Sequence, residues 1–205
     1  MNDTDDDASP QDLFESVGND PGIWATRAEA LLTSAAVLDA QYPQVPQNDS
    51  SAFYGFFKLH IAAMMLKGMA IECLLKSIWI KHVSPLVVKS KFRSIPSTKD
   101  HDLLSLVTAL EEHIELGLSQ EEAALVAVLS HAITSGRYPL ARSISARPTK
   151  PDSGEQMKWC KWEIPADDMR FASIVDKLLR HTDEGAGSQI SAYTIRHRVL
   201  SPRVT

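Results

Sequence analysis

Apolar residues recur at helical spacing in five segments of the chain, and no long segment alternates apolar and polar residues as strands do. The longest segment, residues 52–82, has an apolar stripe broad enough for the centre of a helical bundle. The other four cover residues 23–38, 99–116, 118–136 and 165–185. This pattern predicts an all-α protein, an antiparallel bundle of about five helices in which the shorter helices pack on the long one.

Residues that favour helix ends mark the boundaries of the three later helices. Asp100 is the expected N-cap of the third helix and Ser119 that of the fourth, whose first turn is acidic. Gly136 is the expected stop of the fourth helix, and Pro165 opens the last one. These signals support separate helices joined by breaks.

The length of 205 residues predicts one domain with appended tails. Residues 1–20 are rich in aspartate and poor in large apolar groups, which predicts a disordered acidic leader. The bundle is expected to cover residues 21–184, followed by a C-terminal tail over residues 185–205. Alternating residues over 157–164 permit a short strand there.

Charge is segregated along the chain. The first twenty residues carry seven acidic groups and no lysine or arginine, so the remainder holds 21 basic against 19 acidic groups. Residues 58–99 hold eight basic groups against one acid, whereas residues 100–122 hold seven acids and no lysine or arginine. A basic segment of this kind attracts phosphate, and its candidate nucleic-acid-binding residues are Lys89, Lys91, Arg93 and Lys99. The alternative is a solvated surface whose basic and acidic segments attract each other.

The sequence disfavours several classes of protein. Cys73 and Cys160 have no CxxC spacing, and Cys73 lies in an apolar helical run, so a buried reduced thiol is expected. The acidic N-terminus is unlike a secretory signal, and Lys67, Glu72 and Lys76 interrupt the longest apolar stretch, so no membrane span is expected. The histidines lack the spacing of a metal site, and no cofactor-binding motif occurs. We therefore expect a cytoplasmic protein without metal or cofactor.

Three polar pairs are the candidate ligand-binding residues: Glu72 with Lys76, His101 with Asp102, and Arg137 with Tyr138. Each pair also has a purely structural interpretation. The first has the spacing of a helical ion pair, the second that of a helix N-terminus capped by aspartate, and the third that of a helix C-terminus.

Three stretches resemble, in their order, the HEPN superfamily of small helical-bundle proteins: AIECLLKSIW (70–79), KDHDLLSL (99–106) and LSHAITSGRYPLA (129–141). The resemblance covers about residues 52–141, and the six polar residues above match the family's recurring polar positions. It implies an antiparallel helical bundle, homodimerisation through the long helices, and handling of RNA or nucleotides in defence, toxin–antitoxin or stress systems. The RNase members carry an arginine followed after four to six residues by a histidine. That motif is not present, since seven residues separate Arg93 from His101.

Three functions are compatible with this resemblance. The first is binding of RNA or a nucleotide without a recognisable catalytic motif. The second is a non-enzymatic homodimeric module that holds a partner protein. The third is a metal-independent endoribonuclease toxin with a diverged site, for which His101 and Arg137 are the candidate catalytic residues. In an antiparallel bundle the three polar pairs are expected to converge, either as a ligand site or as a buried polar network that fixes the fold.

Overall fold

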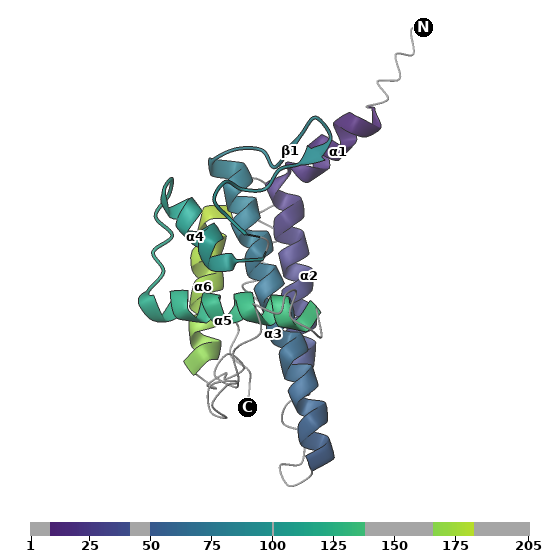
Figure 1. The fold of residues 1–205 in the computed structure, drawn as a ribbon, viewed down its shortest axis with the longest axis vertical. Helices are drawn as coiled ribbons and strands as arrows, with labels where there is room; N and C mark the ends of the chain where they lie inside the picture. Colours follow the sequence, from purple (N-terminus) through teal and green to yellow (C-terminus); the bar gives the residue numbers. More distant parts are fainter. Residues whose placement is uncertain (1–8, 42–49, 100, 138–165, 183–205) are drawn as a thin grey trace, which may run out of the picture.

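The structure, a computed structural model, describes residues 9–41, 50–99, 101–137 and 166–182, with the backbone alone for 50–58 and 135–137. It confirms the all-α class (Figure 1). The described residues form six helices and one two-stranded hairpin: α1 (Pro10–Gly18), α2 (Pro21–Asp39), α3 (Ser50–His82), β1 (Val87–Val88), β2 (Lys91–Phe92), α4 (Leu103–Glu111), α5 (Gln120–Arg137) and α6 (Ala166–Thr182).

The long helix α3 is the centre of the fold, as its apolar stripe predicts. Ile71, Leu74, Leu75 and Ile78 of α3 are fully buried in a core to which α2, α4, α5 and α6 all contribute. None of the described helices is both long enough and apolar enough to cross a membrane.

The helices around α3 differ in direction. The start of α2 lies at the end of α3, where Ser77 donates a hydrogen bond to the Pro21 carbonyl, so these two helices are antiparallel. In contrast, α6 runs parallel to α3, because Asp168 at its start faces Lys67 and the carbonyl of His181 at its end accepts a hydrogen bond from Lys81. Figure 1 shows α5 crossing α3 instead of running alongside it. The antiparallel arrangement thus holds for α2 and α3 but not for every helix.

Helix α1 lies inside the segment expected to be a disordered leader, so that expectation is wrong for residues 10–18. Ser9 caps the helix by accepting a hydrogen bond from the Asp12 amide. Beyond its last turn, the Asn19 side chain donates to the Val87 carbonyl and accepts from the Val87 amide, both at 2.8 Å. These contacts between distant residues stabilise a nine-residue helix that would be marginal by itself.

The hairpin β1–β2 lies in the long connection where the sequence predicts no strand. Val87 pairs with Phe92 and Val88 with Lys91, and the two turn residues between them, Lys89 and Ser90, have φ values of 52° and 57°. Two-residue hairpins of this geometry usually carry Asn-Gly, so Lys-Ser gives no turn signal. The Ser90 amide donates to the Glu15 carboxylate of α1 at 2.8 Å, which holds the turn from outside the hairpin.

The predicted helix starts are confirmed to within one residue for α5 and α6, but α4 covers Leu103–Glu111 and is shorter than the predicted 99–116. Ser119 and Glu122 form a reciprocal capping pair at the start of α5, and α6 begins at Ala166. The N-cap of α4 is Asp102 and not Asp100, because the Asp102 carboxylate accepts the Ser105 amide. Helix α5 continues to Arg137, one residue beyond the predicted stop. The strand predicted for 157–164, the tail over 185–205 and Cys160 lie outside the described residues.

Candidate functional site

Glu72 is the centre of a polar cluster at the junction of α3 and α4. One carboxylate oxygen accepts a hydrogen bond from the Lys76 ammonium at 2.6 Å, and the other lies 2.9 Å from His101 Nδ1. Glu72 is 8% exposed, so both contacts are shielded from water. The predicted ion pair of Glu72 with Lys76 is therefore present, and His101 joins it from the turn that precedes α4.

The protonation state of the cluster follows from its contacts. Burial by itself raises the pKa of Glu72, but the charge and hydrogen bond of Lys76 and the contact with His101 outweigh it and hold the pKa below the usual 4.5. Glu72 is therefore ionised at neutral pH and can only accept hydrogen bonds. Nδ1 of His101 must carry the proton in that contact, which fixes the tautomer of the neutral ring.

The backbone holds His101 in an uncommon conformation. Its φ value is 62°, in the left-handed region that residues other than glycine seldom adopt. The following residues fix this geometry, because Asp102 caps α4 and the Leu103 amide donates to the Ser130 hydroxyl of α5 at 2.7 Å. His101 is thus placed toward Glu72 by the start of α4 and by its contact with α5.

Two aromatic residues that the sequence did not suggest complete the cluster. The Lys76 ammonium lies 5.3 Å from the centre of the Trp24 ring and 5.4 Å from that of Phe92. The two rings are 6.3 Å apart, and the Trp24 indole donates to the Gly18 carbonyl at 3.0 Å. Lys76 is therefore compensated by one carboxylate and two ring faces, and it offers a phosphate less than its sequence position suggests.

The remaining predicted ligand-binding residues do not all enter this cluster. The Asp102 carboxylate accepts the Ser105 amide and caps α4, as the structural interpretation held. Arg137 is the last residue of α5, and its side chain lies outside the described residues, as does the whole of Tyr138. Of the predicted ligand-binding residues, Glu72, Lys76 and His101 thus lie together in the cluster.

Cys73 lies beside the cluster, and its thiol is expected to be a poor nucleophile. The thiol is free and 8% exposed, and burial, with Glu72 nearby, raises its pKa to about 11. The burial and the free thiol are as expected, and a thiol with so high a pKa forms almost no thiolate at neutral pH.

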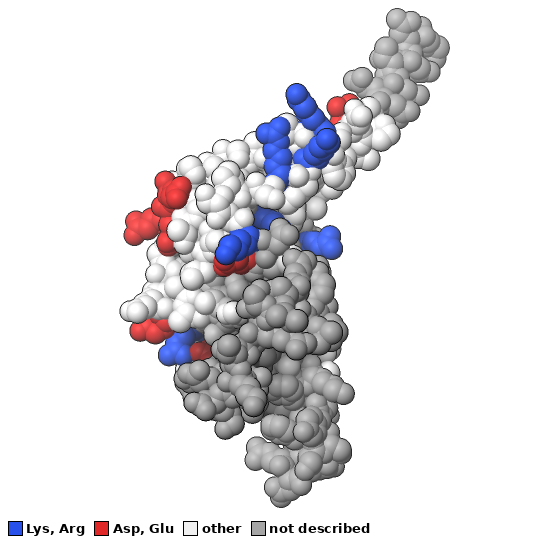
Figure 2. All heavy atoms as spheres, viewed as in Figure 1, with Lys and Arg blue, Asp and Glu red and all other residues white. Residues whose placement is uncertain are grey.

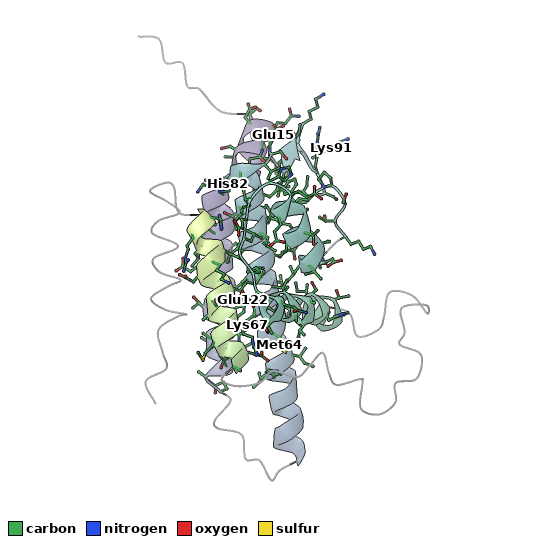
Figure 3. All side chains as sticks on the ribbon, turned by 90° about the vertical axis from the view of Figure 1, so that its left-hand side faces the viewer. Glu15, Met64, Lys67, His82, Lys91 and Glu122 are labelled. Carbon is green, nitrogen blue, oxygen red and sulfur yellow. The ribbon has the colours of Figure 1, made fainter. Side chains whose placement is uncertain are left out.

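A second buried ion pair lies elsewhere along α3. Lys67 is 6% exposed, 2.8 Å from the Asp39 carboxylate of α2 and 5.4 Å from the centre of the Phe171 ring of α6. Figure 3 shows Lys67 and Glu122 at the level where α5 crosses α3, whereas Glu15 and Lys91 lie together near the hairpin. Lys67 joins α2, α3 and α6, which is a structural role.

The charged residues form separate patches on the surface. Lys89, Lys91 and Arg93 are exposed on and beside the hairpin, and Figure 2 shows blue side chains gathered there. Exposed acids at the end of α4 form a separate red group in the same view. Within the described ranges no ion pair joins these two groups. Lys99 is exposed just before α4.

The comparisons with known proteins give no assignment. No known family, curated protein or solved structure matches the chain. In the part of the chain that the structure describes, no group of three or more histidine, cysteine, aspartate or glutamate side chains is placed to hold a metal ion.

Proposed function

We propose that this chain is a HEPN-like helical domain that binds RNA or a nucleotide through the basic hairpin, in a cytoplasmic defence, toxin–antitoxin or stress system. The observation that carries the proposal is the exposure of Lys89, Lys91 and Arg93 within five residues that contain no acid. The order of the three sequence motifs supports the choice of RNA among phosphate ligands.

The hairpin is a well-supported base for phosphate contacts. Asn19 and Glu15 hold its backbone from one side, so its cations project from a fixed hairpin and not from a free loop. Each lysine or arginine that neutralises a phosphate releases bound counterions, which makes such binding strongly dependent on salt. Lys89, Lys91 and Arg93, already the candidate nucleic-acid-binding residues of the sequence, are therefore the principal expected phosphate contacts.

The first prediction concerns the hairpin charges. Replacing Lys89, Lys91 and Arg93 together with glutamine is expected to weaken binding of single-stranded RNA. The slope of log K against log salt concentration should become shallower by about 2, since each phosphate contact on a single strand contributes about 0.7. Fluorescence anisotropy at several salt concentrations measures both quantities.

A matched pair of single variants controls for net charge. Lys91→Gln and Arg180→Gln each remove one positive charge, but Arg180 lies on α6 and is paired with Asp176. Only Lys91→Gln should change the salt slope. Equal effects of the two variants, or failure of the unaltered protein to bind RNA at low salt, would reject binding through the hairpin.

A second candidate function, a homodimeric module that holds a partner protein, is favoured by the surface of α1. Leu13, Phe14 and Val17 are 59%, 50% and 43% exposed, and no residue of this helix is buried. Exposed apolar groups on one helix face are typical of interaction surfaces. Light scattering that gives a dimer, together with indifference to RNA, would favour this function over the first.

A third candidate, a metal-independent endoribonuclease, is favoured by the contact between Glu72 and His101. A carboxylate that accepts the Nδ1 proton orients an imidazole for proton transfer at its other nitrogen. Cleavage of labelled RNA in the presence of a chelator, abolished by His101→Ala, would support it. Intact RNA after prolonged incubation with the unaltered protein would reject it.

A further inference from the structure

Phe92 is a large aromatic side chain displayed beside the hairpin cations. It is 50% exposed, and it lies between Lys91 and Arg93 in the sequence. Its cross-strand partner is Val87, which is 2% exposed, so both side chains lie on the hairpin face that packs toward the junction of α1 and α2. Half of an aromatic ring is thus left in water where the neighbouring residues are cationic.

The ring is held in place by contacts on one side. The Lys76 ammonium and the Trp24 ring approach it at 5.4 Å and 6.3 Å, and Trp24 is itself fixed by its hydrogen bond to Gly18. Glu72 in turn fixes Lys76 at 2.6 Å. A surface that is already ordered loses little conformational entropy when a ligand covers it. The Phe92 ring is therefore held in one orientation before any ligand binds.

We infer that Phe92 is a base-stacking surface and that the strand bound by the hairpin is single-stranded RNA, an inference that rests on the RNA-binding function proposed above. Aromatic plates flanked by cations are the common means of binding single strands, since every base has a face to stack and every nucleotide a phosphate to neutralise. A duplex keeps its base faces stacked inside and offers only its backbone and grooves. An exposed ring between cations is thus suited to an unpaired strand.

The geometry of a strand allows both contacts at once. Adjacent residues have Cα atoms about 3.8 Å apart and side chains on opposite faces. Lys91 and Arg93 therefore lie on the opposite face from the Phe92 ring and leave it uncovered. In the proposed complex the strand passes along the edge of the hairpin, where one base stacks on the ring and the long side chains of Lys91 and Arg93 extend to the neighbouring phosphates. The cluster around Glu72 lies on the inner side of the ring, so it positions Phe92 without contacting the bound RNA.

The first test needs no variant of the protein. Three oligomers about twelve nucleotides long are titrated: oligouridine, a ribose–phosphate backbone of equal length without bases, and a duplex of equal length. Stacking of one base contributes about 1–3 kcal/mol, so oligouridine is expected to bind about fivefold or more tightly than the backbone without bases. Equal affinity for these two, or a preference for the duplex, would overturn the inference.

The second test uses variants of the ring. Phe92→Leu is expected to weaken binding of oligouridine about fivefold or more and to leave its salt slope unchanged, because no charge is removed. Phe92→Tyr keeps an aromatic face and should retain the affinity. The matched control is Phe14→Leu on α1, since Phe14 is also 50% exposed. An equal loss in Phe14→Leu would overturn the assignment to Phe92.

These experiments separate failure of the inference from failure of the proposed function. If none of the oligomers binds at low salt, RNA binding itself is rejected. If all three bind with equal affinity and a normal salt slope, the hairpin still binds RNA, but through phosphates alone and without Phe92. Tight binding of a single-stranded DNA of the same bases, with weak binding of RNA, would overturn the choice of RNA.

Discussion

Replacing Gly68 with valine is expected to lower the free energy of unfolding by about 3 kcal/mol, at the upper end for overpacked helix contacts. A Cβ atom at Gly68 would lie 2.8 Å from Ile133 Cγ1 and 2.9 Å from the Leu129 carbonyl oxygen of α5. The Ile133 side chain can move slightly, but the Leu129 carbonyl is backbone and moves only with its helix. The absence of a side chain at Gly68 is therefore what lets α5 cross α3 so closely.

Gly68→Ala tests the same contact, because the loss of stability expected here is opposite to the gain that helix propensity predicts for this change. In an unobstructed helix this change stabilises by about 1 kcal/mol, but here we expect a net loss of about 1–2 kcal/mol. Ser34→Ala, at an exposed position of α2, is the control and should be nearly neutral. Urea unfolding followed by circular dichroism measures all three variants. A stabilised Gly68→Ala would show that the two helices do not meet at this position.

The sequence predicts well those features that depend on neighbours along the chain. The spacing of Glu72 and Lys76 on one helix is enough to predict their ion pair, and the pattern around Ser119 is enough to predict a cap. Where two aspartates compete, the sequence is insufficient. Asp102 caps α4 because its carboxylate meets the Ser105 amide, a choice that depends on where the chain turns after the hairpin.

Features built from distant residues could not be predicted in the same way. Asn19 and Val87 are 68 positions apart, yet their paired hydrogen bonds stabilise both α1 and the hairpin. Neither partner carries a local signal, because asparagine at a helix end and valine before a turn are ordinary. Phe92 was missed for the same reason, since its importance depends on Trp24 and Lys76 lying beneath it.

These contacts change the interpretation of the polar residues. Lys76 is one of the candidate ligand-binding residues of the sequence, but Glu72 and two rings already surround its ammonium group. The proposed phosphate contacts are Lys89, Lys91 and Arg93, for which the described residues provide no carboxylate or ring partner of this kind. Lys76 instead packs against the Phe92 ring, which lies among them. The polar cluster around Glu72 and the hairpin cations thus meet at Phe92, which contacts Lys76 on one side and lies between Lys91 and Arg93 in the sequence.

Replacing Glu72 with glutamine is expected to lower the free energy of unfolding by about 2 kcal/mol, because the Lys76 ammonium and the His101 ring both lose the negative charge of the carboxylate that they contact. Glu111→Gln, at an exposed position on α4, removes the same charge and should change stability by less than about 0.5 kcal/mol. Lys76→Met keeps an unbranched chain against the two rings. The double variant Glu72→Gln/Lys76→Met should lose less than the sum of the two single losses, since each single change leaves the other partner uncompensated.

The dependence on pH identifies the charge as the cause. Because the folded pKa of Glu72 lies below its unfolded value of 4.5, the stability it contributes is complete above pH 4.5 and is lost as the pH falls through the folded pKa. The difference between the unaltered protein and Glu72→Gln should therefore shrink only on the acid side. A difference that stays constant down to low pH would point to altered packing instead of lost charge.

The same variant separates a structural cluster from a ligand site. If Glu72 acts only by fixing Lys76 beneath Phe92, then Glu72→Gln, measured where it is fully folded, keeps the salt slope of RNA binding and loses at most part of the stacking contribution. If a phosphate instead competes with Glu72 for Lys76, removing the carboxylate frees a cation. Binding then becomes tighter and the salt slope steeper by about 0.7, the value for one phosphate contact. The two roles thus predict changes of opposite sign in the affinity for RNA, which one titration measures.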